Sequence, residues 1–190
     1  MPKLRLAWSL ALGVGLLLAG CVPPASIPRG IQVYFSPRGG ATDAIVNALD
    51  QATNSVLVQA YSFTSAPIAK ALVEAHRRGV KVQVILDRGQ RTEKYSEADF
   101  LKNNGIRTFI DAQHAIAHNK VMIIDDCVVL TGSFNFTKAA EEHNAENLLV
   151  INDPALAKPY VGNWHTHEQH SEAYERAEKP AERTSRTKRQ

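Results

Sequence analysis

Residues 118–135 read HNKVMIIDDCVVLTGSFN, and the fold is most readily inferred from this stretch. Two β-prone runs, residues 119–124 and 128–130, flank the pair Asp125-Asp126, which is typical of two strands joined by a turn. Side chains two positions apart on a strand point to the same face, so His118 and Lys120 are expected to face the same way. The stretch therefore predicts a pair of strands that presents an imidazole and an ammonium side by side.

The segments around this strand pair alternate between strand and helix patterns. Short β-prone runs predict further strands at residues 31–35, 55–63, 80–86, 107–110 and 148–151. Apolar residues at helical spacing predict helices at residues 42–52, 65–78, 98–103 and 154–170. This alternation is typical of an α/β fold, here a mixed, largely parallel sheet sandwiched by helices. Residues 31–170 are therefore expected to form one domain.

Composition and charge bound the function only loosely. The 190 residues are 44% hydrophobic and 22% charged, with a formal net charge of +3, which fits one globular domain. The basic surplus lies near the two ends of the chain, so the domain between them is close to neutral and gives no electrostatic argument for nucleic acid. Residues 171–190 are charged and poor in apolar side chains, so we expect a disordered tail.

The N-terminal residues have the pattern of a secretory signal. Lys3 and Arg5 precede an apolar run, residues 6–18, and the run ends in Leu-Ala-Gly-Cys21, which resembles the lipobox of bacterial lipoproteins. We therefore expect residues 1–20 to be a signal peptide and Cys21 to be lipidated. An ordinary cleaved signal is the alternative.

On both interpretations of this signal we expect the protein to be exported. Residues 21–30 contain three prolines and are expected to form a tether. A lipidated protein would lie on the periplasmic face of a membrane, with the outer membrane favoured because Val22 follows the cysteine; without the lipid it would be periplasmic.

The spacing within residues 118–135 resembles the signature of the phospholipase D superfamily. The pattern is His-x-Lys, four residues, Asp, six residues and then Gly-Ser-x-Asn. The wider run, residues 34–153, is most similar to small bacterial endonucleases of the Nuc type, which carry this motif once. The resemblance implies the phospholipase D-like fold and a phosphodiesterase that works through a phosphohistidine, without a metal or other cofactor.

The side chains of the motif suit this chemistry. An imidazole beside an ammonium fits an anionic phosphate ester, so His118 is expected to attack phosphorus while Lys120 neutralises charge. Ser133 and Asn135, also two positions apart, can bind phosphate oxygens together with Lys120. Glu146 matches the family's position for the carboxylate that fixes the tautomer of His118 and leaves Nε2 free to attack.

Asp125 lies an odd seven positions from His118, and it is therefore expected to face away and to have a supporting role. A second acid must also protonate the leaving oxygen, because nucleophile and leaving group lie on opposite sides of phosphorus. Related single-motif proteins form a two-fold dimer, so the resemblance implies a homodimer in which the partner subunit's His118 is that acid.

Three function classes remain open on the sequence. Cleavage of DNA or RNA comes first, with Arg38, Arg88 and Arg91 as candidate contacts in loops that follow strands. The alternative is phospholipase D activity on membrane phosphatidyl lipids, such as the conversion of phosphatidylcholine to phosphatidic acid, which a lipid anchor would bring within reach. A non-catalytic phosphate-binding lipoprotein is the third, and the intact His118 and Lys120 argue against it.

Six histidines lie outside the motif, and four of them bear on the question of a second site. His165, His167 and His170 have the spacing i, i+2, i+5 on one predicted helix, which is not expected to converge, so we predict no metal site there. His114 is expected to be a loop residue near the site, with contact to substrate as the alternative.

Overall fold

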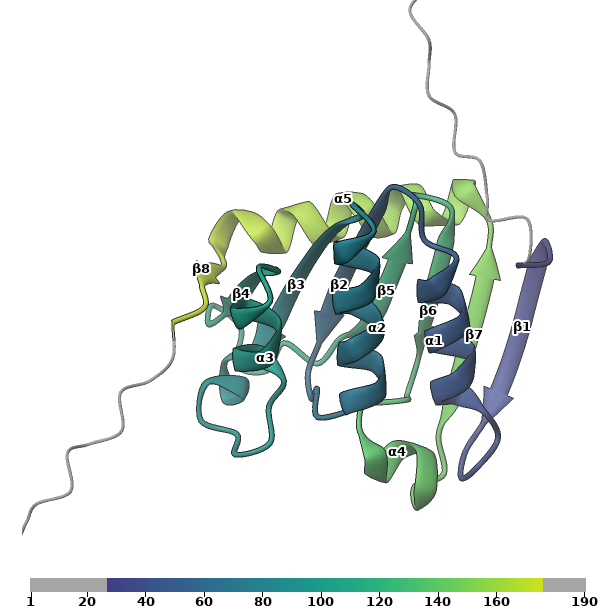
Figure 1. The fold of residues 1–190 in the computed structure, drawn as a ribbon, viewed down its shortest axis with the longest axis horizontal. Coiled ribbons are helices and arrows are strands. Elements are labelled where there is room, and N and C mark those ends of the chain that lie inside the picture. Colours follow the sequence, from purple (N-terminus) through teal and green to yellow (C-terminus); the bar gives the residue numbers. More distant parts are fainter. Residues whose placement is uncertain (1–26, 176–190) are drawn as a thin grey trace, which may run out of the picture.

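Eight strands form one sheet in residues 27–175, the part of the chain that the computed structural model describes (Figure 1). The strands are β1 (Gly30–Phe35), β2 (Ser55–Ala60), β3 (Lys81–Asp87), β4 (Arg107–Asp111), β5 (Lys120–Ile124), β6 (Val128–Gly132), β7 (Asn147–Asn152) and β8 (Glu172–Ala173). Their order across the sheet is β1-β7-β6-β5-β2-β3-β4-β8. The helices are α1 (Ala41–Asp50), α2 (Ala66–Arg77), α3 (Ala98–Asn103), α4 (Lys138–Glu142) and α5 (Pro154–His170), with a short 3-10 helix at Arg88–Arg91.

The sheet is mixed, as predicted, but it is not largely parallel. Within the described residues only the pairs β2–β3 and β3–β4 are parallel, and the other pairings are antiparallel. The prediction was wrong because β5, β6 and β7 follow one another without long crossover helices. The tight turn at Asp125 and Asp126, both with positive φ, can join only antiparallel strands.

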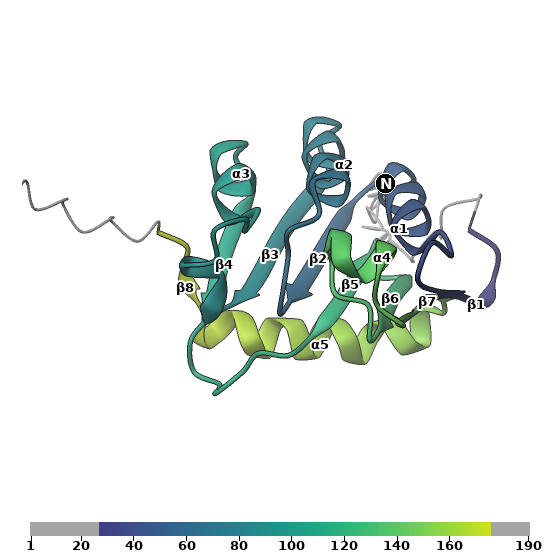
Figure 2. The ribbon, with the colours of Figure 1, turned by 90° about the horizontal axis from the view of Figure 1, so that it is seen from below.

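Helices cover both faces of the sheet. Figure 2 shows α1, α2 and α3 on one face and the long α5 alone on the other. Helix α2 begins with a proline in its first turn, buries Ile68, Leu72 and Ala75 toward the sheet, and ends before Gly79, whose φ is 93°. Under α5 the apolar core is smaller and centres on Trp164, whose indole N–H donates to the carbonyl of Val58 at 2.9 Å. Strand β2 is buried on both faces, which suits its central place.

Strand direction brings several polar residues of the motif to one edge of the sheet. The carboxyl ends of β1, β2, β3, β4 and β6 and the amino ends of β5 and β7 all lie there, at the lower edge in Figure 1. We call this the motif edge. It carries His118 and Lys120 at the start of β5 and Ser133 directly after β6.

The structure corrects two predicted element boundaries and adds one helix. Strand β8 pairs with β4, and Tyr174 is only 4% exposed, so residues 171–175 are not part of a disordered tail. Gly30 begins β1 rather than ending a tether. Helix α4 was not predicted, although Thr137 caps it by accepting a hydrogen bond from the N–H of Ala140.

The predicted signal peptide, Cys21 and most of the tether lie outside the described residues, as does the rest of the tail. Within residues 27–175, every helix is too short or too polar to cross a membrane.

Candidate active site

His118 and Lys120 are in direct contact at the motif edge. The Nζ of Lys120 lies 3.0 Å from the Nε2 of His118 and donates to the carbonyl oxygen of His118, also at 3.0 Å. An ammonium has donors only, so Nε2 must be the acceptor. A neutral His118 therefore carries its proton on Nδ1, which is the tautomer that a nucleophilic Nε2 requires.

Tyr61 packs against both members of this pair. Its ring centroid is 4.6 Å from that of His118 and 5.0 Å from the Nζ of Lys120. The register that pairs Ala60 with Lys120 places Tyr61 there, and its N–H donates to the carbonyl of Asn119 at 2.8 Å. Tyr61 was not among the site residues predicted from the sequence. Its place directly after a strand that pairs with β5 becomes visible only once the pairing is known.

Burial and charge act in opposite directions on Lys120. Burial lowers the pKa of its ammonium below the ordinary value, and the negative charge of Glu146 partly offsets that shift. Glu146 itself is held by Ser36, whose Oγ accepts from its backbone N–H at 3.2 Å, and by the Asn144 side-chain amide at 3.2 Å. Among residues 27–175 no hydrogen bond joins Glu146 to His118, so its role in fixing the tautomer stays a prediction.

Ser133 has a hydroxyl proton to offer to a phosphate. Its Oγ accepts hydrogen bonds from the backbone N–H of Asn147 at 3.1 Å and from the side-chain amide of the same residue at 3.3 Å. Both contacts use the lone pairs of Oγ, so the O–H is left to donate elsewhere. Asn135 is partly buried, and its Oδ1 has no hydrogen-bond partner within the described part of the chain. The predicted phosphate-binding residues thus retain hydrogen-bonding capacity.

Gly132 permits the close approach that holds Ser133. Its φ is 149°, and a Cβ at this position would lie 2.3 Å from the carbonyl oxygen of Asn147. A larger residue would push β6 away from β7 at the point where Ser133 and Asn147 meet.

Asp125 lies at the other end of β5 from Lys120, so it does not reach the motif edge. Its carboxylate accepts hydrogen bonds from the backbone N–H groups of Thr53, Asn54 and Ser55 at 2.7–2.9 Å, and from the Thr53 hydroxyl at 2.9 Å. These contacts close the loop that leads into β2. The supporting role predicted for Asp125 is therefore structural: its carboxylate holds residues 53–55 and does not reach the motif edge.

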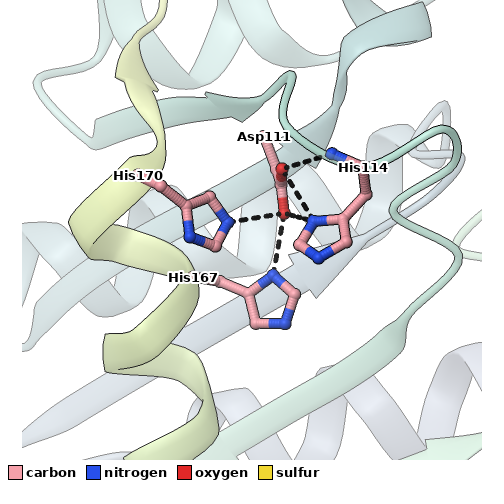
Figure 3. A group of neighbouring side chains, drawn as sticks. All are labelled: Asp111, His114, His167 and His170. Carbon is pink, nitrogen blue, oxygen red and sulfur yellow. Dashed lines mark hydrogen bonds and ion pairs between the residues drawn. The ribbon is translucent and has the colours of Figure 1, made fainter.

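Two of the C-terminal histidines do converge, contrary to the prediction. His167 and His170 on α5 both point at the buried carboxylate of Asp111, the last residue of β4, and His114 approaches it from the following loop (Figure 3). Burial raises the pKa of Asp111, but hydrogen bonds from the three imidazoles outweigh it and hold this pKa well below its usual value. The spacing of the histidines along α5 did not predict this group, because its residues come from β4, the following loop and α5.

Some residues singled out in the sequence belong neither to the site around His118 and Lys120 nor to the group around Asp111. His165 turns away from Asp111 and contacts Glu168, with its Nδ1 3.0 Å from a carboxylate oxygen. Arg38, in the loop after β1, and Arg88, the first residue of the 3-10 helix after β3, are exposed at the motif edge. Arg91 is engaged in an ion pair with Glu172.

The imidazole of His118, the buried ammonium of Lys120 and the hydroxyl of Ser133 lie together at the motif edge. This combination suits the hydrolysis of phosphodiester bonds, and the similarity to known proteins shows that the chain is a hydrolase of this class. The family model described as "Cardiolipin synthase, PLD-like domain" matches residues 45–166. The chain belongs to the phospholipase D superfamily.

Individual relatives agree with this assignment. A phospholipase D of Rickettsia conorii is 46% identical over 134 residues, which are 70% of this chain and 67% of that protein. A mitochondrial cardiolipin hydrolase of Xenopus laevis is 35% identical over 141 residues, 74% of this chain and 67% of its own length. The crystal structure of Nuc, a phospholipase D family member from Salmonella typhimurium, is 42% identical with a TM-score of 0.73, over 76% of this chain and 97% of that one.

Proposed function

We propose that this phosphodiesterase is an endonuclease that cleaves DNA or RNA. The observation that carries the proposal is that the exposed His118 and its partner Lys120 lie at the same open sheet edge as two exposed arginines, Arg38 and Arg88. An open edge with positive side chains on both sides of the reacting groups suits a long anionic polymer. The resemblance of the motif to single-motif endonucleases points the same way.

The reaction would proceed in two displacements. Nε2 of His118 attacks phosphorus, the bond to the leaving oxygen breaks, and that oxygen takes a proton from an acid on the far side. Water then attacks the phosphohistidine, gives up a proton to the same acid, and releases His118. Lys120 and Ser133 would hold the non-bridging oxygens, where negative charge builds up in both transition states.

We propose that the acid is the partner subunit's His118 in a two-fold homodimer. A surface for such a partner is available on β1, which is an edge strand. Ile31, Val33 and Phe35 form a stripe on one of its faces and are 69%, 50% and 65% exposed. A contiguous exposed apolar stripe favours association, and Phe35 brings it to the motif edge.

Phospholipase D activity on phosphatidyl lipids is the second candidate, and one observation favours it. Ile116, two positions before His118, is 57% exposed, and an apolar side chain beside the reacting groups suits an acyl-chain surface. The lipobox-like sequence ending at Cys21 supports export and a lipid anchor, with the outer membrane favoured, and an anchor would hold the site close to such a substrate.

Nicking of supercoiled plasmid in excess chelator tests the first proposal. Wild-type protein should cleave, His118→Ala should not, and His165→Ala, which alters an exposed histidine on α5, should cleave like the wild type. If neither the wild type nor His118→Ala cleaves DNA or RNA, the same proteins are assayed on phosphatidylcholine vesicles. Release of phosphatidic acid there by the wild type alone would replace the endonuclease by the phospholipase.

A further inference from the structure

We propose that the chain binds a divalent transition-metal ion, with zinc as the best match, at a site separate from the phosphodiesterase site. Its ligands would be four residues, Asp111, His114, His167 and His170, called here the Asp111 cluster (Figure 3). Nothing in the motif chemistry uses these residues.

The four side chains are already gathered to the dimensions of a metal site. Oδ2 of Asp111 is 2.9 Å from Nδ1 of His114, 2.8 Å from Nδ1 of His167 and 3.3 Å from Nε2 of His170. All four candidate ligand atoms lie within 4.8 Å of one another. In a tetrahedral zinc site with bonds of about 2.0–2.1 Å, ligand atoms are about 3.3 Å apart. Small rotations of the side chains would therefore accommodate an ion at the centre.

The carboxylate at the centre has more neighbours than hydrogen bonding alone readily explains. Its Oδ1 accepts from the backbone N–H of Gln113 at 3.1 Å and contacts both the backbone N–H and the Nδ1 of His114, while Oδ2 faces all three imidazoles. A carboxylate offers about four lone-pair sites, which is fewer than the contacts made here. An ion that takes the imidazole lone pairs and one carboxylate oxygen would relieve this crowding.

Charge and access also fit a cation. One carboxylate and three neutral imidazoles carry a charge of about −1, and they form a donor set that zinc accepts. His167 and His170 lie in the last turn of α5, where the helix dipole favours positive charge. The Asp111 side chain is fully buried, whereas that of His114 is 45% exposed. An ion can therefore enter from solvent on the His114 side and finish on a buried carboxylate.

The position of the cluster indicates a structural ion. Strands β4 and β5 are three strand spacings apart, or about 14 Å, so the ion would not touch a phosphate held by Lys120. It would instead join α5 to the loop that runs from Asp111 to His118. The far end of that loop is already held, since the N–H of Ala117 donates to the carboxylate of Asp87 at 2.8 Å. The ion would fasten the near end of the loop.

Metal content and affinity test this proposal without any assay of activity. The full chain, prepared without a polyhistidine tag, is dialysed against Zn²⁺, and bound zinc is measured by elemental analysis and by competition with a chelating dye. Wild-type protein should hold one Zn²⁺ per chain. His114→Ala and His167→Ala should weaken zinc binding by at least about 100-fold. Mutating a residue that only hydrogen-bonds to a metal ligand already lowers metal affinity by about 10–100-fold, and these two residues would be ligands themselves.

His165→Ala is the matched control, since His165 lies on the same helix, is 53% exposed and contacts Glu168 rather than Asp111. It should bind zinc like the wild type. Zinc should also raise the melting temperature of the wild type and of this control by roughly 5–10 °C at saturation, but not that of His114→Ala, whose exposed loop position makes misfolding a poor explanation. Wild-type protein without zinc, or unchanged affinity in both ligand variants, would overturn the proposal and leave a cluster held by hydrogen bonds alone.

Discussion

The ammonium of Lys120 donates a hydrogen bond to the Nε2 of His118 over 3.0 Å. The group that we expect to neutralise phosphate charge therefore contacts the nitrogen that we propose attacks phosphorus. In the free enzyme this contact keeps the Nε2 lone pair occupied and His118 in one tautomer. In the proposed mechanism, the oxygens of a bound phosphodiester would accept the hydrogen bonds of this ammonium, and Nε2 would become free to attack. Binding of the substrate would then expose the nucleophile.

Replacing Lys120 should separate activity from stability. Lys120→Met is expected to lower the rate of phosphodiester cleavage by at least about 10³-fold, because it removes the charge beside phosphorus. The variant should be no less stable than the wild type, since a buried ammonium costs desolvation free energy. Cleavage rates and urea denaturation measure the two quantities. Lys138→Met, at a lysine whose side chain is 78% exposed, should change neither.

The pH profile should report the lowered pKa of Lys120. Below this pKa the ammonium is charged and active, so activity should decline with rising pH at a value below the ordinary 10.5. The folded chain holds this proton less tightly than the unfolded chain. The contribution of Lys120 to the free energy of unfolding should therefore rise with pH between its lowered pKa in the folded chain and the ordinary 10.5.

Glu146→Gln isolates the contribution of the carboxylate to this profile. The charge of Glu146 raises the pKa of Lys120, so its removal should move the alkaline decline to lower pH. If Glu146 acts only by fixing the tautomer of His118, the maximal rate would fall while the position of the decline stayed the same. The pH dependence of kcat/KM distinguishes the two.

Gly132→Ala should damage both the fold and the site. A methyl group at this position meets the carbonyl oxygen of Asn147 at 2.3 Å and must adopt a φ of 149°, so we expect a loss of about 2–4 kcal/mol in unfolding free energy. Activity per folded molecule should fall as Ser133 moves. Gly162→Ala is the control: it lies on α5 with open space around it and should be neutral or stabilising by up to about 1 kcal/mol.

Asp125 and Asp126 form a matched pair for the architectural role. Both have positive φ, which asparagine tolerates, but only Asp125 is buried and accepts hydrogen bonds from residues 53–55. Asp125→Asn should lower the unfolding free energy by about 2–3 kcal/mol. The NH2 group of asparagine is a hydrogen-bond donor, and it would face the backbone N–H donors of residues 53–55. Asp126→Asn should cost less than about 0.5 kcal/mol. A loss of activity in fully folded Asp125→Asn would contradict a role remote from the site.

Mixed dimers test whether two chains share one active site. Wild-type protein is exchanged with a tenfold excess of His118→Ala, so that nearly every wild-type chain is paired with an inactive one. If both imidazoles act on one phosphate, activity per wild-type chain should fall to about one-tenth. Unchanged activity would mean that each chain works alone. Phe35→Asp, which charges the exposed stripe of β1, should give an inactive monomer on a sizing column.

Local pattern was sufficient for much of this protein. The β-prone run of residues 119–124 and the Asp125-Asp126 pair predicted a strand and its turn. The period of two along a strand placed His118 beside Lys120. Both are properties of a chain a few residues long. The spacing of the motif was likewise enough to indicate the superfamily.

Other features depend on which segments become neighbours, and a local pattern carries no such information. The direction of each strand, the packing of Tyr61 on His118 and the four contacts of Asp125 with residues 53–55 all follow from sheet order and register. Asp111 meets the histidines of α5 across more than fifty positions of sequence, and only the path of α5 over the sheet brings them together. Hydrophobic periodicity predicts which face of a helix or strand is buried. Which other element packs against that face depends on the packing of the whole chain.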